Sequence, residues 1–226
     1  MQDNEILSHI DHTVLFANAT KEDIRTCLSE ATTYGCATVC IPPSYVRFAA
    51  EWLTENDLSL PICTVVAFPL GYQTTTMKVI ESSGLINDGA DEIDVVINIG
   101  WLKEGRLEEI RQELYAIRTA TKGKVLKVII ETCLLTDEEK ITMCEIVSEV
   151  GADYIKTSTG FSHSGADLRD IELFRQHLSP QVKIKAAGGI RTREQMVAFL
   201  KAGCERLGSS GGVALLTAQD RAGKTK

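Results

Sequence analysis

The sequence predicts an α/β fold, namely a single (β/α)8 TIM barrel with a short N-terminal extension. Short apolar runs rich in β-branched residues alternate with longer stretches of helical period, as expected for parallel strands joined by covering helices. The chain has 226 residues, of which 44% are hydrophobic, enough for one substantial core. We therefore expect one domain over residues 1–226, with about 218–226 as a flexible tail.

Eight segments are expected to form the strands of the barrel. The first is less apolar than the others and contains Asp11 and His12, whereas the remaining seven are clear apolar or glycine-flanked runs. In chain order the segments are SHIDHTV (8–14), CATVCI (36–41), PICTVVAF (61–68), DEIDVVINI (91–99), KVLKVIIE (124–131), ADYIKTS (152–158), QVKIKAA (181–187) and ERLGSS (205–210). The active site of such a barrel lies at the carboxyl ends of its strands.

Capping signals mark the helices between these strands. Thr20 to Asp23 resembles a capping box that opens a helix reaching Tyr34, and Thr136 to Glu139 opens another. Gly35, Gly89, Gly151 and Gly203 are placed as C-terminal stops of helices. An open doubly wound sheet is the alternative fold, but the first strand–helix turn lacks GxGxxG and no GxxxxGK[ST] pattern occurs.

Charge and composition favour a small-molecule partner. A formal net charge of −7 and a pI near 5.2 provide no cationic footprint for nucleic acid or an anionic membrane. No apolar stretch approaches the roughly 18 residues that a membrane span requires. The acidic stretch Glu104 to Glu113 is interpreted as the solvated face of a helix.

Cysteines and histidines indicate neither a disulfide framework nor a metal centre. Seven cysteines at scattered spacings, without a CxxC pair, indicate reduced thiols in a cytoplasmic protein. The four histidines show no HxH or HExxH spacing, so we expect no metal and place His12 and the others in loops or at the surface.

Three lysines inside predicted strands suggest amine chemistry. Lys127, Lys156 and Lys185 lie on the fifth, sixth and seventh strands, which are neighbours about 4.8 Å apart in a parallel barrel. We expect mutual repulsion and burial to lower the pKa of the nucleophilic amine, as a Schiff-base enzyme requires. Asp94 and Asp11 offer carboxylates for proton transfer. Structural ion pairs among these residues are the alternative interpretation.

Two glycine-containing loops suggest a phosphate site. Gly188 and Gly189 follow the seventh strand and precede a helix, while LGSSGG (207–212) ends the eighth strand and opens the last helix. Glycine lets backbone NH groups approach an anion, and a helix N-terminus adds favourable donors. Loops after strands seven and eight hold phosphate in many barrels.

The order of motifs resembles the family of 2-deoxyribose-5-phosphate aldolases. The resemblance runs from about residue 5 to residue 217, and its most specific parts are YIKTSTGF and KAAGGIRT. The matching segments are IDHTVL (10–15), FPLG (68–71), GADEIDVV (89–96), LKVIIET (126–132), YIKTSTGF (154–161), KAAGGIRT (185–192) and RLGSSGG (206–212).

This resemblance implies a class I aldolase that cleaves 2-deoxy-D-ribose 5-phosphate to acetaldehyde and D-glyceraldehyde 3-phosphate, without metal or other cofactor, and that forms a homodimer. It implies a Schiff base at Lys156, a second active-site lysine at Lys185 and a proton relay at Asp94. The accessory positions are Lys127 and Asp11; the phosphate contacts are Gly160, Gly188, Gly189 and Ser210. A different phosphate-binding barrel enzyme and a non-catalytic sugar-phosphate binding protein remain as alternatives.

Overall fold

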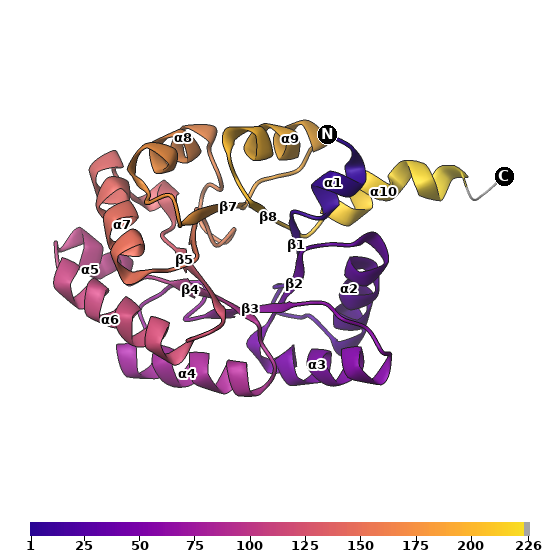
Figure 1. Ribbon diagram of the computed structural model, residues 1–226, viewed down its shortest axis with the longest axis horizontal. Helices are drawn as coiled ribbons and strands as arrows, with labels where there is room; N and C mark the ends of the chain where they lie inside the picture. The colour runs from indigo at the N-terminus through magenta and orange to yellow at the C-terminus, as the bar shows by residue number, and fades with distance from the viewer. Residues whose placement is uncertain (224–226) are drawn as a thin grey trace.

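Eight parallel strands close into a barrel, as predicted. A computed structural model describes residues 1–223, and Figure 1 shows its strands as a central ring surrounded by helices. Each strand pairs with the next along the chain, and the last pairs with the first, which closes the sheet. The strands are β1 (Ile10–Thr13), β2 (Thr38–Ile41), β3 (Ile62–Val66), β4 (Glu92–Val96), β5 (Val125–Ile129), β6 (Tyr154–Lys156), β7 (Lys183–Ala187) and β8 (Arg206–Ser209).

Helices occupy the connections after the strands and form the outer layer. They are α1 (Asp3–Leu7), α2 (Lys21–Tyr34), α3 (Val46–Glu55), α4 (Thr75–Asn87), α5 (Ile99–Lys103), α6 (Leu107–Ala120), α7 (Asp137–Val150), α8 (Leu168–His177), α9 (Arg193–Ala202) and α10 (Gly212–Gly223), with 3-10 turns η1 (Pro43–Tyr45) and η2 (Thr132–Leu134). The expected N-terminal extension forms α1, which contacts α10. The flexible tail expected over about 218–226 coincides with the end of α10 and then lies outside the described residues.

The predicted caps set several helix boundaries. The Thr20 hydroxyl accepts a hydrogen bond from the Asp23 amide, and Thr136 and Glu139 form the same capping box at the start of α7. Gly35 and Gly151 end α2 and α7 in the left-handed conformation, where a Cβ would be strained.

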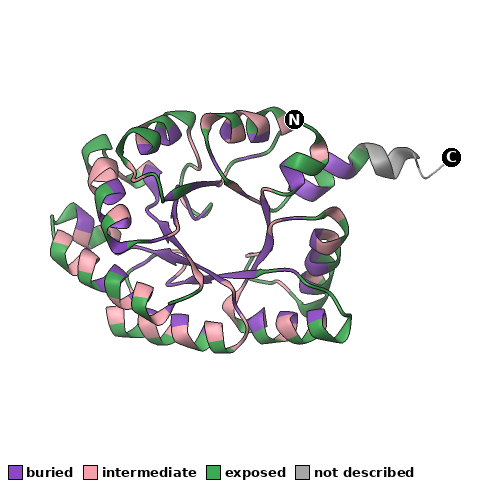
Figure 2. Cartoon of the chain, viewed as in Figure 1, coloured by how far each residue is buried: buried purple, intermediate pink, exposed green. Residues whose placement is uncertain are grey.

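The apolar core lies between the barrel and its helices. Figure 2 shows the strands as largely buried and the helices as buried on the side that faces the barrel. Outward-facing strand residues such as Ile93, Val95 and Val128 belong to this core, whereas the alternate positions Asp94 and Lys127 point inward. Strand alternation thus separates an apolar layer from a charged barrel interior.

Two expectations about polar residues were wrong. His12 is buried, and its Nε2 lies 3.0 Å from the Glu30 Oε2, because the outward face of β1 is covered by α2. Glu113 is also buried and pairs with Lys78 of α4, because α6 packs that side against α4. Both carboxylates therefore accept hydrogen bonds within the helical layer.

Candidate active site

Ionisable side chains fill the inside of the barrel, and strand register brings them together. Asp94 is the register partner of Lys127, and Lys156 is the register partner of Lys185. Residues paired in this way on parallel strands point to the same face of the sheet. The barrel cluster, as we call it, consists of Asp11, Glu92, Asp94, Lys127, Lys156, Lys185 and Arg206.

Asp94 is the centre of the barrel cluster. Its Oδ2 accepts hydrogen bonds from Lys156 Nζ at 2.8 Å and from Lys185 Nζ at 2.7 Å. Its Oδ1 accepts a hydrogen bond from Lys127 Nζ at 2.8 Å. The Cys63 thiol donates to the same Oδ1 at 3.1 Å. One fully buried carboxylate therefore holds three ammonium groups in place.

The other carboxylates lie around Lys127, Lys185 and Arg206. Lys127 Nζ lies 2.5 Å from Glu92 Oε2, and Lys185 Nζ donates to Asp11 Oδ2. Arg206 bridges the two acids, because its Nη1 lies 2.6 Å from Asp11 Oδ1 and its Nη2 lies 3.0 Å from Glu92 Oε1. In contrast, Lys156 contacts Asp94 as its only carboxylate within the described chain.

These contacts change the electrostatics expected from the lysines alone. Burial by itself would raise the pKa of the Asp94 carboxyl, but Lys127, Lys156 and Lys185 outweigh burial and hold that pKa well below its usual range. Burial would lower the pKa of Lys185, but Asp11 and Asp94 raise it overall, and Asp94 likewise raises the pKa of Lys127. For these two amines the neighbouring carboxylates therefore outweigh burial.

The barrel cluster nevertheless has an excess of positive charge. It contains four cationic and three acidic side chains, so one positive charge has no counterpart within it when every group is ionised. Uncompensated charge is costly in a water-poor interior. Removing one proton from the barrel cluster would balance its charge.

A cleft of about 340 Å³ opens at the carboxyl ends of the strands, above the barrel cluster. Of the three clustered lysines, Lys156 lines this cleft, whereas Lys127 and Lys185 lie beneath it. Thr13 and Ser209 line it from the ends of β1 and β8. The Lys156 amine is therefore accessible to a molecule bound in the cleft, whereas the side chains of Lys127 and Lys185 do not line the cleft.

The loops predicted to bind phosphate form one side of the cleft. Gly160, Gly188, Gly189 and Ser210 all line it, so the structure brings together the four predicted phosphate residues. Gly188 has φ +83°, and a Cβ there would lie 3.1 Å from the Gly165 Cα; a Cβ on Gly165 would lie 2.2 Å from the Gly188 carbonyl oxygen. Glycine at both positions therefore allows the two loops to touch through their backbones.

Glu131 supports the loop that follows Lys156, a role that we did not predict. It is buried, has a left-handed backbone with φ +54°, and its Oε2 accepts a hydrogen bond from the Thr159 hydroxyl at 2.5 Å. Both carboxylate oxygens also accept from the Thr159 amide at 3.3 Å. A non-glycine residue in this conformation is strained, and such strain is typical of functional sites.

Sequence reasoning also missed Glu92, Arg206 and Arg191. Glu92 and Arg206 complete the barrel cluster, and Arg191 lines the cleft beside the Gly188–Gly189 loop. Side chains in a strand alternate with a period of two, so Glu92 lies on the same face as Asp94. This pattern in the sequence could have identified Glu92 as part of the site. The position of Arg206 depends on how far neighbouring strands are staggered, which the sequence pattern does not contain.

A cleft at the carboxyl ends of eight parallel strands, with an amine at its floor, is the architecture of a (β/α)8-barrel enzyme. Residues 6–219 match the model of the DeoC/LacD family aldolases. The chain therefore belongs to the DeoC/LacD aldolase family.

Known relatives agree with this assignment. The chain is 49% identical over 223 residues to a deoxyribose-phosphate aldolase from Clostridium botulinum strain Alaska E43, which covers 99% of this chain and 100% of that protein. It is 50% identical over 208 residues to a deoxyribose-phosphate aldolase from Bacillus cereus strain AH187, with 92% of each covered. The tetrameric deoxyribose phosphate aldolase from Aeropyrum pernix superimposes with a TM-score of 0.89 at 29% identity, covering 98% of this chain and 93% of that one.

Within residues 1–223 the helical layer contains no candidate for a membrane span. Across the described residues, every helix is either too short or too polar to cross a bilayer.

Proposed function

We propose that the protein is a class I aldolase that reversibly cleaves 2-deoxy-D-ribose 5-phosphate to acetaldehyde and D-glyceraldehyde 3-phosphate. One observation carries the assignment of residues. Lys156 Nζ lies 2.8 Å from the buried Asp94 carboxylate and at the floor of the cleft, so it combines access to substrate with a group that moves protons. The aldolase relatives described above support the choice of substrate.

In this mechanism, Lys156 attacks the C1 aldehyde of the open-chain sugar, and water leaves to give a protonated imine. The imine withdraws electrons from C2 while Asp94, directly or through water, accepts the proton of the C3 hydroxyl. The C2–C3 bond then breaks, which releases glyceraldehyde 3-phosphate and leaves an enamine on the lysine. Protonation at C2 and hydrolysis release acetaldehyde and restore the amine.

The remaining residues of the barrel cluster prepare these steps. Lys185 shares Asp94 Oδ2 with Lys156, so a proton can move among the two amines and the carboxylate. Lys127 and Asp11 have accessory roles. Lys127 donates a hydrogen bond to Asp94 Oδ1 and so fixes the orientation of that carboxylate, and the negative charge of Asp11 compensates the positive charge of Lys185. The single excess positive charge favours loss of one proton from the barrel cluster.

The sugar phosphate is placed against the glycine loops. Gly160, Gly188 and Gly189 have positive φ and no side chain, so their amides are accessible to an anion at the edge of the cleft. Ser210 adds a residue just before α10, whose N-terminus favours negative charge. Anchoring the phosphate there would hold C1 within reach of the amine.

Borohydride trapping tests this assignment. Treatment with acetaldehyde and borohydride should add one ethyl group to the protein, and peptide mass spectrometry should locate it on Lys156. The variant Lys156→Met should lose the adduct and turnover. Lys183→Met is the matched control, because Lys183 is exposed on β7, and it should keep both. An adduct on Lys185 or Lys127 would contradict the division of roles among the three lysines while leaving the reaction class intact.

Assembly and location are also part of the proposal. We propose a homodimer, because Leu70, Tyr72, Met77 and Ile80 expose apolar side chains on α4 and the loop before it. Light scattering at several protein concentrations tests the dimeric state.

The seven free thiols support a cytoplasmic location, since oxidising compartments favour disulfides. Fractionation of cells that produce the protein tests this location.

A further inference from the structure

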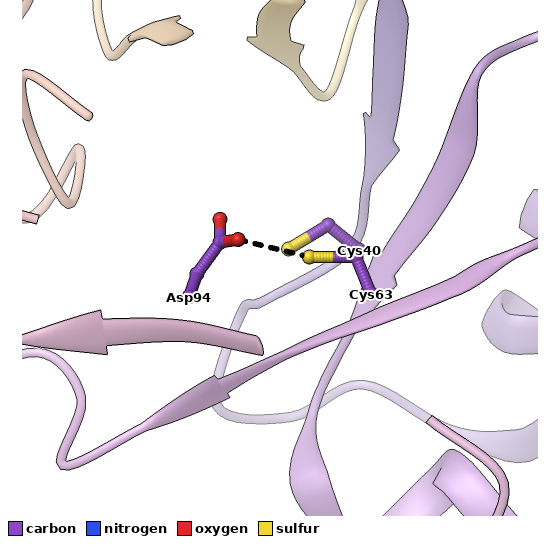
Figure 3. Close-up of side chains that lie close together, drawn as sticks. All are labelled: Cys40, Cys63 and Asp94. Atoms are coloured by element: carbon purple, nitrogen blue, oxygen red, sulfur yellow. Dashed lines mark hydrogen bonds between the residues drawn. The ribbon is translucent and has the colours of Figure 1, made fainter. Parts of the chain in front are cut away.

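Two cysteines face each other across neighbouring strands of the barrel interior. Cys40 on β2 and Cys63 on β3 are register partners in the parallel sheet. Their sulfur atoms and an Asp94 carboxylate oxygen all lie within 4.8 Å of one another. Figure 3 shows the two thiols beside Asp94, with the hydrogen bond from Cys63 to that carboxylate.

We propose that Cys40 and Cys63 form a reversible disulfide when the protein meets a hydroperoxide, and that this modification stops turnover by disturbing Asp94. The effect on turnover rests on the proposed function; formation of the disulfide does not. The pair is therefore assigned as a modification site within an enzyme whose thiols are otherwise reduced.

Backbone geometry permits the bond. Neighbouring strands are about 4.8 Å apart, which falls within the roughly 4.4–6.8 Å Cα separation found for disulfides. Register partners on parallel strands also direct their side chains to the same face, so the two sulfurs already share one space. Formation of the bond requires side-chain rotation and no rearrangement of the barrel.

The two thiols differ in reactivity, as nucleophile and resolving thiol should. The contact with Cys63 and the positive charge of Lys185 outweigh burial and lower the pKa of the Cys40 thiol. Burial and the contact between the two thiols raise the pKa of the Cys63 thiol, so Cys63 retains its proton. Burial raises the pKa of Cys144 and Cys204 to about 12, which makes them poor nucleophiles.

The reaction proceeds in two balanced steps. The Cys40 thiolate attacks one peroxide oxygen, the O–O bond breaks, and Cys40 becomes a sulfenic acid while the leaving oxygen takes a proton to form water (or an alcohol from an organic peroxide). Cys63 then attacks the Cys40 sulfur, the S–O bond breaks, and hydroxide leaves with the Cys63 proton as water. Both sulfurs are oxidised by one electron, and the peroxide is reduced by two.

A small oxidant can reach the pair through the cleft. Cys40 and Cys63 form a small buried group with Val65, and the partly buried Leu15 and Phe68 pack against that group. Leu15 also lines the cleft, as Lys156 does. Leu15 therefore contacts both the thiol group and the space that admits substrate, and we assign the route of the oxidant to this contact.

The disulfide would act on the residue that all three lysines share. Cys63 donates its thiol hydrogen to Asp94 Oδ1, and Lys127 Nζ donates to the Cys63 sulfur at 3.2 Å. Bonding of Cys63 to Cys40 removes the first of these hydrogen bonds and draws the sulfur away from Lys127. Asp94 would then lose one of its four hydrogen-bond donors.

The same atoms offer ligands to a soft metal ion, but charge opposes that use. A thiophilic dication would enter a site where Lys127, Lys156 and Lys185 already place ammonium groups against Asp94. Disulfide formation adds no positive charge, so the barrel cluster favours oxidation over metal binding.

Peroxide titration of the full-length protein tests the proposal. Purified reduced protein is treated with hydrogen peroxide, the excess is removed with catalase, and aldolase rate and intact mass are measured together. The expected result is a loss of two hydrogen atoms in mass, a linked peptide containing Cys40 and Cys63, and a rate that falls in proportion to the linked fraction. Dithiothreitol should restore both mass and rate.

Two variants separate this site from other thiols, with each rate normalised to that of the untreated variant. In Cys63→Ser the sulfenic acid has no resolving thiol, so the loss of rate should become irreversible as sulfinic acid accumulates. Cys133→Ser removes the most exposed cysteine and should respond like the unmodified protein. A Cys27–Cys36 link, or reversible loss in Cys63→Ser, would overturn the proposal. A linked Cys40–Cys63 peptide in a protein that forms no borohydride adduct would instead overturn the proposed function.

Discussion

The molecule buries lysine ammonium groups in two places that differ in design. Between α4 and α6, Lys78 Nζ lies 2.6 Å from Glu113 Oε1 and donates to the Val96 carbonyl at 2.9 Å, and Thr75 donates to the other oxygen of Glu113. This pair is neutral overall and lies within the helical layer. Inside the barrel, Asp94 is shared by three lysines, and one of them lines a cleft.

Burial of a lysine is therefore not sufficient to mark an active site. Burial lowers the pKa of Lys78 more than Glu113 raises it, whereas the carboxylates of the barrel cluster raise the pKa of Lys185 despite its burial. What distinguishes the barrel cluster is a shared carboxylate, an excess cation and access to a cleft. Variants of the two sites should separate loss of activity from loss of stability.

The largest effect is expected for Lys156→Met. Loss of the nucleophile should reduce kcat by at least about 10⁴-fold, as removal of a covalent catalyst does in other enzymes. The same change removes the excess cation, and Asp94 keeps Lys127 and Lys185, so thermal and urea unfolding should show equal or greater stability. Strong destabilisation of the Lys156→Met protein would contradict the conclusion that the barrel cluster has one excess positive charge.

Lys78→Met should give the opposite result. It leaves Glu113 buried without its cation, which costs about 3–5 kcal/mol of unfolding free energy. The rate per folded molecule should stay within about threefold of the parent, because Lys78 does not line the cleft and pairs with Glu113 in the helical layer. The double change Lys78→Met with Glu113→Leu should recover most of the lost stability, since an apolar pair avoids desolvation. Urea denaturation beside an active-site titration measures both quantities.

Glu131→Gln tests a buried carboxylate that positions a loop. The glutamine amide is uncharged and has one acceptor oxygen where glutamate has two, so weakening of the charge-assisted hydrogen bonds to Thr159 by about 1.5 kcal/mol should raise KM for the sugar phosphate roughly tenfold. The kcat should change less, and turnover of the unphosphorylated sugar should be unaffected. Glu145→Gln is the control, because that residue is exposed on α7. An equal loss with both sugars would indicate general damage to the site.

The smallest effect concerns the pH dependence of stability. The folded-state pKa values of Asp94 and Asp11 are lowered, so their stabilisation is complete above about pH 4 and is lost as pH falls further. The pKa values of Lys127 and Lys185 are raised, so their stabilisation is lost as pH rises above about 10.4. Lys78 has a lowered pKa and contributes the opposite slope just below that pH.

Unfolding free energies measured between pH 3 and pH 11 check these signs, at about 1.4 kcal/mol per pH unit for each titrating group. Lys185→Met should flatten the alkaline decline. Lys78→Met should leave that decline unchanged and instead remove the rise in stability just below about pH 10.4. Identical alkaline slopes in the two variants would show that the two sites do not differ electrostatically.

Local patterns predicted the fold and the neighbouring strands of three lysines, but not the compensation of charge. The order of the apolar runs placed Lys127, Lys156 and Lys185 on consecutive strands, because each run forms one strand of the parallel barrel. Which carboxylate meets which amine depends on the stagger of the closed barrel, and this decided the pKa directions. The burial of His12 and Glu113 likewise depends on packing between elements, which no local pattern records.

The sharing of Asp94 also restricts how such a site can change during evolution. If Asp94 is lost first, three buried amines lose a partner in a single substitution, so that path passes through an unstable protein. If Lys156 is lost first, the carboxylate still serves two amines, and the chain can persist as a folded protein without the nucleophile. Descendants that abandon this chemistry should therefore lose the lysine before the aspartate.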